Sequence, residues 1–479
     1  MGRIGSGFIN RGIDEIKKHD LVFLFLVIFT IYNLNFRPIG SGDTLPASLL
    51  PFSILDQHTV FFDHFINYIQ TIKNPYMFTV HGGHYVSFFP IVLPVIVTPL
   101  YVIPYLFLNF FHIPVDMVNP SFAMICLVMD KIAASFIATL SAVFLYMSLK
   151  HLFSAKISLL CTLIYAFATS TWTISSQSLW QHGAVELFVV ILLYLVVMNE
   201  KQENRNNFLL MGVFSGLLFF CRPVDGILLL PVIYYVLIHK TPEKLYYAGA
   251  LTLSSLPFAA YNFYFFNNLF GGYGALFSRF IFNFEVIMSF LGLIISPNRG
   301  LFIFSPVCLL AIFGIFWLTR MKTKKTMHYF FMVMAISIVC QIIPFGFFKA
   351  WWGGWCYGPR YLTELLPFFM IFLAIYFDNF SKTTWTKKGI KKYFIGFVII
   401  ILICWSVFVQ IVGAFYYPNN SWDANPDINQ NTQRLWDWKD SQILYSFWAG
   451  PYSSNGITVF LNKSPTDNFL KIQRQGYTI

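Results

Sequence analysis

Asp43 is the residue of this chain best placed to do chemistry. It lies in the sequence Ser41-Gly42-Asp43-Thr44-Leu45-Pro46, just after an apolar stretch at 21–36 that is long enough to cross a bilayer. Basic residues before that stretch predict that it starts in the cytoplasm, so Asp43 should emerge on the outer side beside the lipid headgroups. There a carboxylate could act as a general base on membrane-anchored substrates. The alternative is that Asp43 caps a helix beginning at Thr44.

Four cations are predicted on the same outer side, where few positive charges are expected. Arginine has a planar fork that suits phosphate oxygens. We therefore expect these cations to bind the phosphate of a lipid carrier, with Arg360 the strongest candidate. Alternatively, each one caps a helix C-terminus or extends to the lipid headgroups. They lie beside turn-forming or aromatic residues, in Cys221-Arg222-Pro223, Pro297-Asn298-Arg299-Gly300, Lys349-Ala350-Trp351-Trp352 and Gly358-Pro359-Arg360-Tyr361.

Aromatic and polar residues on this side predict a site for the sugar or its acceptor. Trp180 and His182 end a polar segment, and Trp352, Trp355 and Tyr361 are interleaved with glycines. A helix cap is the alternative role for His182.

The first outer loop adds further candidates for binding the acceptor or orienting Asp43. They are Asp63, His64, His84 and Tyr85, for which ordinary solvated polarity is the alternative interpretation. No group of residues has the spacing of a tight metal site, so no metal ligand is predicted, and a divalent metal is an alternative that we do not favour. The seven cysteines mostly lie in apolar runs, which argues against a disulfide scaffold, and no cofactor motif is present in the sequence.

Composition indicates a polytopic membrane protein. The chain is 57% hydrophobic and only 11% charged, whereas a soluble domain carries about twice that share of charge. The net charge of +11 does not indicate a nucleic-acid partner. More than half of the Lys and Arg residues lie in the N-terminus and in five short clusters, at 150–156, 201–205, 240–244, 320–325 and 382–392, which is typical of cytoplasmic loops.

Apolar runs between these clusters predict an all-α fold with about eleven spans. No small-residue cleavage site follows the first span, so we expect it to be retained. The segment 85–111 contains four prolines and would reverse the side of every later basic cluster if it crossed once, so a broken interfacial or re-entrant element is predicted there. The multi-span domain is 1–415, with a first outer loop at 37–124, and 416–479 is an outer tail. The spans are near 21–36, 125–149, 157–173, 183–198, 208–221, 225–238, 245–266, 302–319, 328–347, 362–378 and 393–415.

Most of the chain resembles the membrane-embedded C-type (GT-C) glycosyltransferases that use polyprenyl-phosphate sugars. It is especially similar to protein mannosyltransferases and lipid A aminoarabinose transferases. The resemblance depends on Gly42-Asp43-Thr44-Leu45-Pro46, Leu50-Pro51-Phe52-Ser53-Ile54-Leu55, Gly83-His84-Tyr85-Val86-Ser87, Ser178-Leu179-Trp180-Gln181-His182, Ser296-Pro297-Asn298-Arg299-Gly300-Leu301, Trp352-Gly353-Gly354-Trp355 and Gly358-Pro359-Arg360-Tyr361.

This resemblance implies an inverting hexosyl or pentosyl transfer outside the cytoplasm, with Asp43 catalytic and 85–111 as juxtamembrane helices. The implied partners are a polyprenyl-phosphate sugar donor, a lipid, glycan or protein acceptor, and the lipids of a bacterial inner membrane. The paired Asp-x-Asp metal motif of the oligosaccharyltransferase branch is missing at Asp43. A transporter or lipid flippase for envelope glycan precursors is the main alternative, and a non-catalytic scaffold is the other.

Overall fold

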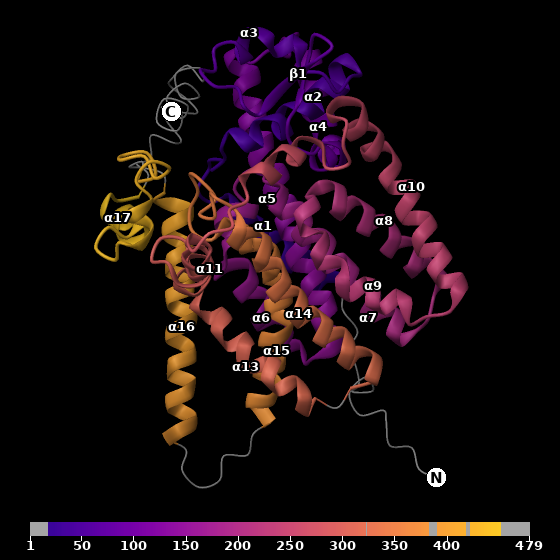
Figure 1. Ribbon diagram of the computed structural model, residues 1–479, viewed down its shortest axis with the longest axis vertical. Coiled ribbons are helices and arrows are strands. Elements are labelled where there is room, and N and C mark those ends of the chain that lie inside the picture. The colour runs from indigo at the N-terminus through magenta and orange to yellow at the C-terminus, as the bar shows by residue number, and fades with distance from the viewer. Residues whose placement is uncertain (1–17, 322, 383–389, 418–421, 452–479) are drawn as a thin grey trace.

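The computed structural model of the chain is a bundle of helices with one small β-hairpin (Figure 1). It describes residues 18–321, 323–382, 390–417 and 422–451. Long apolar runs form the helices, and their side chains fill the interior of the bundle. The elements are α1 (Lys18–Asn33), α2 (Leu45–Gln57), α3 (Ile66–Ile69), β1 (Phe78–His81), β2 (His84–Ser87), α4 (Val92–Phe110), α5 (Pro120–Leu152), α6 (Ala155–Phe167), α7 (Gln181–Lys201), α8 (Arg205–Cys221), α9 (Leu230–Leu237), α10 (Thr241–Phe266), α11 (Glu285–Ile295), α12 (Leu301–Phe304), α13 (Leu309–Trp317), α14 (Lys325–Phe347), α15 (Leu366–Lys382), α16 (Ile390–Phe415) and α17 (Gln442–Trp448).

A helix lies at each of the predicted spans, which confirms the predicted all-α membrane fold. Within the described ranges, 6 helices are long and apolar enough to cross a membrane by themselves, so the count of eleven is not confirmed. Two of the shorter helices follow a proline that begins a 3-10 helix: Pro223 precedes α9 and Pro306 precedes α13. The six are α4, α5, α7, α14, Arg360–Lys382 and Tyr393–Phe415.

Helix α4 differs from the broken element predicted at 85–111. Residues 84–87 belong to strand β2, and α4 continues through Pro99 and Pro104. Each proline removes one backbone hydrogen bond, but α4 packs against α2 and α5, and this packing offsets the cost. The predicted break at the prolines was therefore wrong, because 92–110 is one continuous helix. By length and composition alone, α4 could span a membrane.

One end of the bundle carries α2, α3 and the hairpin, and we call it the loop end (Figure 1). The hairpin pairs Phe78 with Ser87 and His81 with His84. Its turn is Gly82-Gly83, with φ of +58° and +87°, a conformation that glycine adopts without steric cost.

Helices α8 and α10 approach each other closely because Gly212 and Gly216 have no side chains. A Cβ atom at Gly212 would lie 2.3 Å from the Tyr247 carbonyl oxygen, and one at Gly216 would lie 2.4 Å from the Ser254 hydroxyl. This spacing of small residues is a common way for membrane helices to pack.

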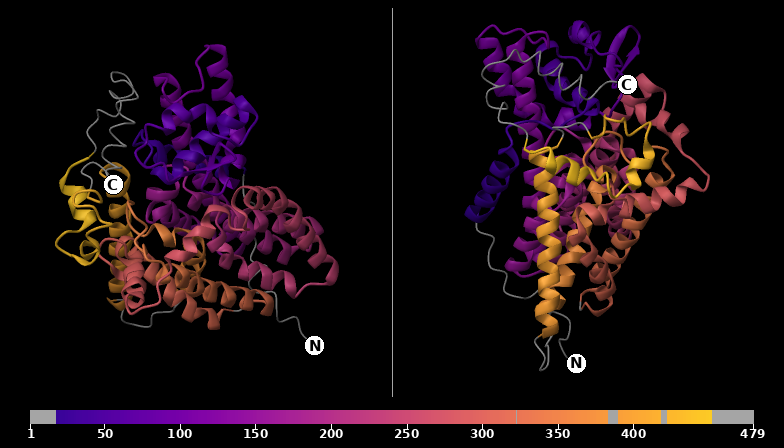
Figure 2. Two further views of the ribbon diagram at one scale, coloured as in Figure 1. Left: turned by 45° about the horizontal axis from the view of Figure 1, so that its top comes forward. Right: turned by 90° about the vertical axis from the view of Figure 1, so that its left-hand side faces the viewer.

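Helix α16 runs along one side of the bundle (Figures 1 and 2). The following segment, 422–448, lies at one end of α16 and includes α17, which packs against it. This segment belongs to the predicted outer tail.

Candidate active site

Asp43 lies in a 3-10 turn, Gly42–Thr44, that leads into α2. Ser41 caps this turn, since its hydroxyl accepts a hydrogen bond from the Asp43 backbone N–H at 3.1 Å. Thr44 is the residue directly before α2, and its side chain makes no capping hydrogen bond to that helix. The alternative reading of Asp43 as a helix cap was therefore wrong, and its carboxylate instead contacts residues far away in the sequence.

Arg360 and Tyr76 hold the two oxygens of the Asp43 carboxylate. Arg360 Nη1 lies 2.9 Å from Oδ2, and the Tyr76 hydroxyl donates to Oδ1 at 2.8 Å. The Asp43 side chain is 24% exposed and that of Arg360 is 11% exposed, so the pair is mostly buried but Asp43 remains open to solvent. Each carboxylate oxygen has two lone pairs, so Asp43 can still accept a proton from a further donor.

Arg360 begins the 3-10 helix Arg360–Leu365, which leads directly into α15. Its guanidinium lies over the ring of Trp180, with 4.6 Å to the centroid, and over that of Tyr361, with 5.3 Å. Its Nε is buried and has no hydrogen-bond partner among the residues that the structure describes. An unfilled buried donor is costly, so this N–H group of Arg360 could be satisfied by a ligand.

Arg222 lies in a neighbouring buried network. Its Nη1 contacts the carboxylates of Glu364 and of Asp225, the latter at 3.1 Å. Glu364 also contacts His182 Nδ1, so His182 belongs to this network. Two carboxylates already offset the charge of Arg222, which makes it a weaker attractor of phosphate than Arg360.

Tyr361 joins the two groups of residues. Its ring lies 5.7 Å from the Arg222 guanidinium and 5.3 Å from that of Arg360, and it stacks on Phe345 at 4.8 Å. The predicted residues Trp180, His182, Tyr361, Arg222 and Arg360 therefore form one continuous cluster around Asp43.

Arg299 is placed elsewhere, and all five of its N–H groups are used. Only 1% of its side chain is exposed. It therefore has no N–H group left for a phosphate, and its contacts join the 350–358 loop to the segment 422–448. Its acceptors, at 2.6–3.1 Å, are the carbonyls of Asn298, Trp352 and Gly354 and the side chains of Asp423 and Gln442.

Trp352 and Trp355 are bound to the same C-terminal segment. The indole N–H of Trp352 donates to Asn429 at 3.1 Å, and that of Trp355 donates to Asp427 at 2.9 Å. Both side chains stay partly exposed, so their rings can still contact a ligand.

Asp63, His84 and Tyr85 are brought together in the first loop. Asp63 lies 2.5 Å from His84 Nδ1 and accepts the Tyr85 backbone N–H at 2.8 Å. His84 also stacks on Phe61, with ring centroids 4.4 Å apart. His64 is not part of this group: its Nε2 is buried without a partner in the described part of the chain, and burial lowers its pKa.

Lys349 is exposed, and its backbone N–H donates to the Arg279 carbonyl. Among the contacts of the described residues, Arg360 is thus the one predicted phosphate-binding cation that touches Asp43. No group of three or more His, Cys, Asp or Glu in the described part of the chain is arranged to hold a metal ion.

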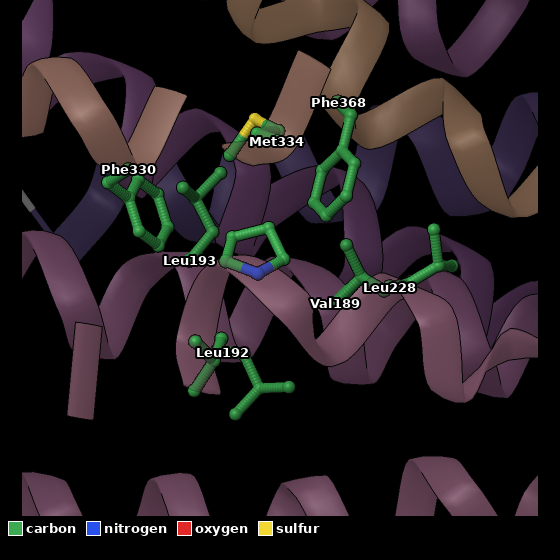
Figure 3. A pocket seen from close by; sticks show the side chains of 9 residues that line it. Val189, Leu192, Leu193, Leu228, Phe330, Met334 and Phe368 are labelled. Atoms are coloured by element: carbon green, nitrogen blue, oxygen red, sulfur yellow. The ribbon is translucent and has the colours of Figure 1, made fainter. Parts of the chain in front are cut away.

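An apolar pocket lies away from this cluster, between α7, α9, α14 and α15 (Figure 3). Its lining holds no polar side chain that could bind a sugar or phosphate. The residues lining it are Val189, Leu192, Leu193, Leu228, Pro231, Val232, Phe330, Met334 and Phe368.

Sequence reasoning missed several polar residues near the site. The signal was a charged residue inside an apolar run, which is rarely kept without a role. Tyr76 gave no such signal, because tyrosines are common throughout this chain. The charged residues missed are Asp130, Lys131, Glu186, Asp225 and Glu364, all of them buried.

The fold and the cluster together define a helical membrane protein with a carboxylate, a guanidinium and aromatic rings at one end of its bundle. The family model of the dolichyl-phosphate-mannose-protein mannosyltransferases matches residues 131–264, a little over a quarter of the chain. This match confirms the resemblance to the GT-C membrane glycosyltransferases.

One similar solved structure is the archaeal oligosaccharyltransferase AglB from Archaeoglobus fulgidus, in complex with an inhibitory peptide and a dolichol-phosphate. The match has a TM-score of 0.46 and 9% sequence identity, and it covers 88% of this chain and 60% of that one. No curated protein matches this chain in sequence.

Proposed function

We propose that this protein transfers a sugar from a polyprenyl-phosphate carrier to a hydroxyl acceptor on the outer side of the membrane. The observation that carries the proposal is the contact between Asp43 and Arg360. A base paired with a phosphate-binding cation suits a reaction in which a hydroxyl attacks while a phosphate leaves. The family match over residues 131–264 supports the same class of donor.

In the proposed reaction, the acceptor oxygen bonds to the anomeric carbon from the face opposite the phosphate, so the configuration inverts. The bond from that carbon to the phosphate oxygen breaks, and its electron pair stays on the phosphate. Asp43 takes the proton of the acceptor hydroxyl. Hydrogen bonding by Tyr76 at 2.8 Å would keep the carboxylate oriented for this step.

Arg360 would stabilise the charge that develops on the departing phosphate. Its partnerless Nε supports this role, because a phosphate oxygen would fill that donor. Trp180 would hold the guanidinium flat against its ring, and Trp180 and Tyr361 would offer aromatic faces to the sugar. In the proposed acceptor site, Asp63, His84 and Tyr85 form the polar part.

The deciding experiment incubates purified protein with a panel of polyprenyl-phosphate sugars and a membrane extract that supplies hydroxyl acceptors, and follows donor consumption by mass spectrometry. Wild type is compared with Asp43→Asn, which keeps the shape of the side chain and removes the base. We expect one sugar-lipid to be consumed by wild type, and its turnover to fall by about a hundredfold or more in the variant. Full turnover by Asp43→Asn would contradict the role of Asp43.

Two further arms separate the alternatives. A parallel reaction with a chelator tests for a divalent metal, which the proposal does not require. Counterflow of labelled sugar-lipid in sealed liposomes tests for transport. Binding and exchange of a sugar-lipid across the liposome without any cleavage would favour the flippase alternative.

A further inference from the structure

We propose that Asp130 and Lys131 of α5 position the catalytic segment by holding the turn at residues 176–180. The expected effect of these residues on catalysis rests on the function proposed above. Their effect on the structure of the turn can be tested without any activity. Neither residue touches Asp43 or Arg360 in the described structure, so both would act through other groups.

The two charges are buried at consecutive positions about three turns into α5, with 6% of Asp130 and 4% of Lys131 exposed. Buried charges are costly unless hydrogen bonds satisfy them. Asp130 accepts from the Ser178 hydroxyl at 2.5 Å and the Leu179 backbone N–H at 2.8 Å. Lys131 donates to Gln177 Oε1 at 2.7 Å and to the Ser176 carbonyl at 3.3 Å. All four bonds go to one turn of the chain.

The turn at 176–180 also binds the segment that leads to Asp43. The Gln177 carbonyl accepts the Ile39 backbone N–H at 3.0 Å, and its side-chain Oε1 accepts Asn35 Nδ2 at 2.6 Å. A Cβ atom at Gly40 would lie 2.5 Å from the Ser178 hydroxyl, so the Gly40 backbone packs closely against the Ser178 side chain. Gly40 lies only three residues before Asp43, so a shift of the turn should also shift the Asp43 carboxylate.

The same turn ends at Trp180, whose ring contacts the Arg360 guanidinium. Trp180 donates its indole N–H to the Ile39 carbonyl at 3.2 Å, and its ring lies beneath the Arg360 guanidinium. A displaced turn would therefore move both members of the catalytic pair. A misplacement of about 1 Å can cost on the order of a hundredfold in rate.

The test combines hydrogen–deuterium exchange with turnover in the full-length protein. In Asp130→Ala and Lys131→Met we expect faster amide exchange in both 35–44 and 176–182, and at least a tenfold lower kcat. Asp130→Asn, which keeps one acceptor oxygen, should restore part of both. Ser178→Ala removes only the hydrogen bond from the Ser178 hydroxyl to Asp130 and leaves α5 unchanged. This variant replaces Asp130→Ala in the test if Asp130→Ala does not fold.

Ser141→Ala is the matched control, because Ser141 is also buried in α5 and bonds Tyr165 at 2.6 Å, away from the turn. It should leave exchange in both segments unchanged. Unchanged exchange at 35–44 in the Asp130 and Lys131 variants, or equal losses in the control, would overturn the inference. If wild type consumes no donor while exchange rises as expected, the positioning stands and the proposed function fails.

Discussion

The carboxylate of Asp43 and the guanidinium of Arg360 meet at 2.9 Å although 317 residues separate them in the sequence. The contact joins the first loop to the residue that begins the segment leading into α15. It brings the proposed proton acceptor and the proposed phosphate-binding group within hydrogen-bonding distance of each other. Substitution of Asp43 should therefore mainly lower turnover, whereas substitution of Arg360 should also weaken donor binding.

Substitution of Arg360 should weaken donor binding. Arg360→Ala removes a charged hydrogen-bonding group worth about 1.5–3 kcal/mol, so the Kd for polyprenyl phosphate should rise roughly tenfold to a hundredfold. Arg360→Lys keeps the charge and loses the planar fork, and an intermediate effect is expected. Binding of polyprenyl phosphate without a sugar, followed by calorimetry or native mass spectrometry, measures this directly.

Lys349→Ala is the control for that series, because Lys349 is exposed. Its effect on the Kd should stay within about twofold. An Arg360→Ala variant with wild-type affinity would remove the phosphate role from Arg360 and leave the role of Asp43 intact.

Tyr76→Phe should lower kcat by about tenfold, with little change in the Kd for the donor. The substitution deletes the hydroxyl that donates to Asp43 Oδ1 and leaves the Arg360 contact in place. Steady-state turnover over a range of donor concentrations separates the two constants. Tyr105→Phe is the control, because its hydroxyl approaches a different carboxylate, Asp56, at 3.5 Å. Equal losses in the two variants would argue against a specific role for Tyr76.

Hydropathy and basic clusters predict where the helices lie, because a span needs a long apolar run. They could not predict that α4 continues through its prolines, since this depends on packing against α2 and α5. Nor could they predict the short helices after Pro223 and Pro306, where a 3-10 turn replaces the start of a span.

The sequence predicted many residues of the candidate site, but it did not predict which side chains they contact. Arg222, Arg299 and Arg360 look alike in sequence, since each follows or precedes a turn-forming residue. Their surroundings differ because Glu364, Asp423 and Asp43 come from distant segments. Only the folded chain separates a guanidinium with an unfilled donor from one whose donors are all used.

Acidification should destabilise the first loop around His64. Burial lowers the pKa of His64, and the nearby carboxylates of Asp56, Asp116 and Asp63 offset this only in part. The folded loop therefore binds fewer protons than the unfolded loop, so its stability is intact above the ordinary histidine pKa of about 6.5 and falls below it.

Hydrogen–deuterium exchange of residues 56–69 at pH 7.5 and pH 5.5, corrected for the intrinsic pH effect, would measure this change. His64→Phe removes the titrating group and should flatten the difference. A pH response that persists unchanged in this variant would assign it to another group of the loop.

Gly212→Ala should destabilise the packing of α8 on α10. The added Cβ would lie 2.3 Å from the Tyr247 carbonyl oxygen, and backbone atoms cannot move aside as a flexible side chain can. Overpacking of this kind costs about 1–3 kcal/mol, which should lower the Tm of the detergent-solubilised protein by about 1–3 °C. Gly249→Ala on α10 is the matched control, since among the described residues no atom beyond its chain neighbours and the nearby backbone of α10 lies within 4 Å of its added Cβ. Alanine favours helix over glycine, so this control should leave the Tm unchanged or raise it slightly. An equal fall in both variants would mean that the loss comes from the helices themselves and not from their contact.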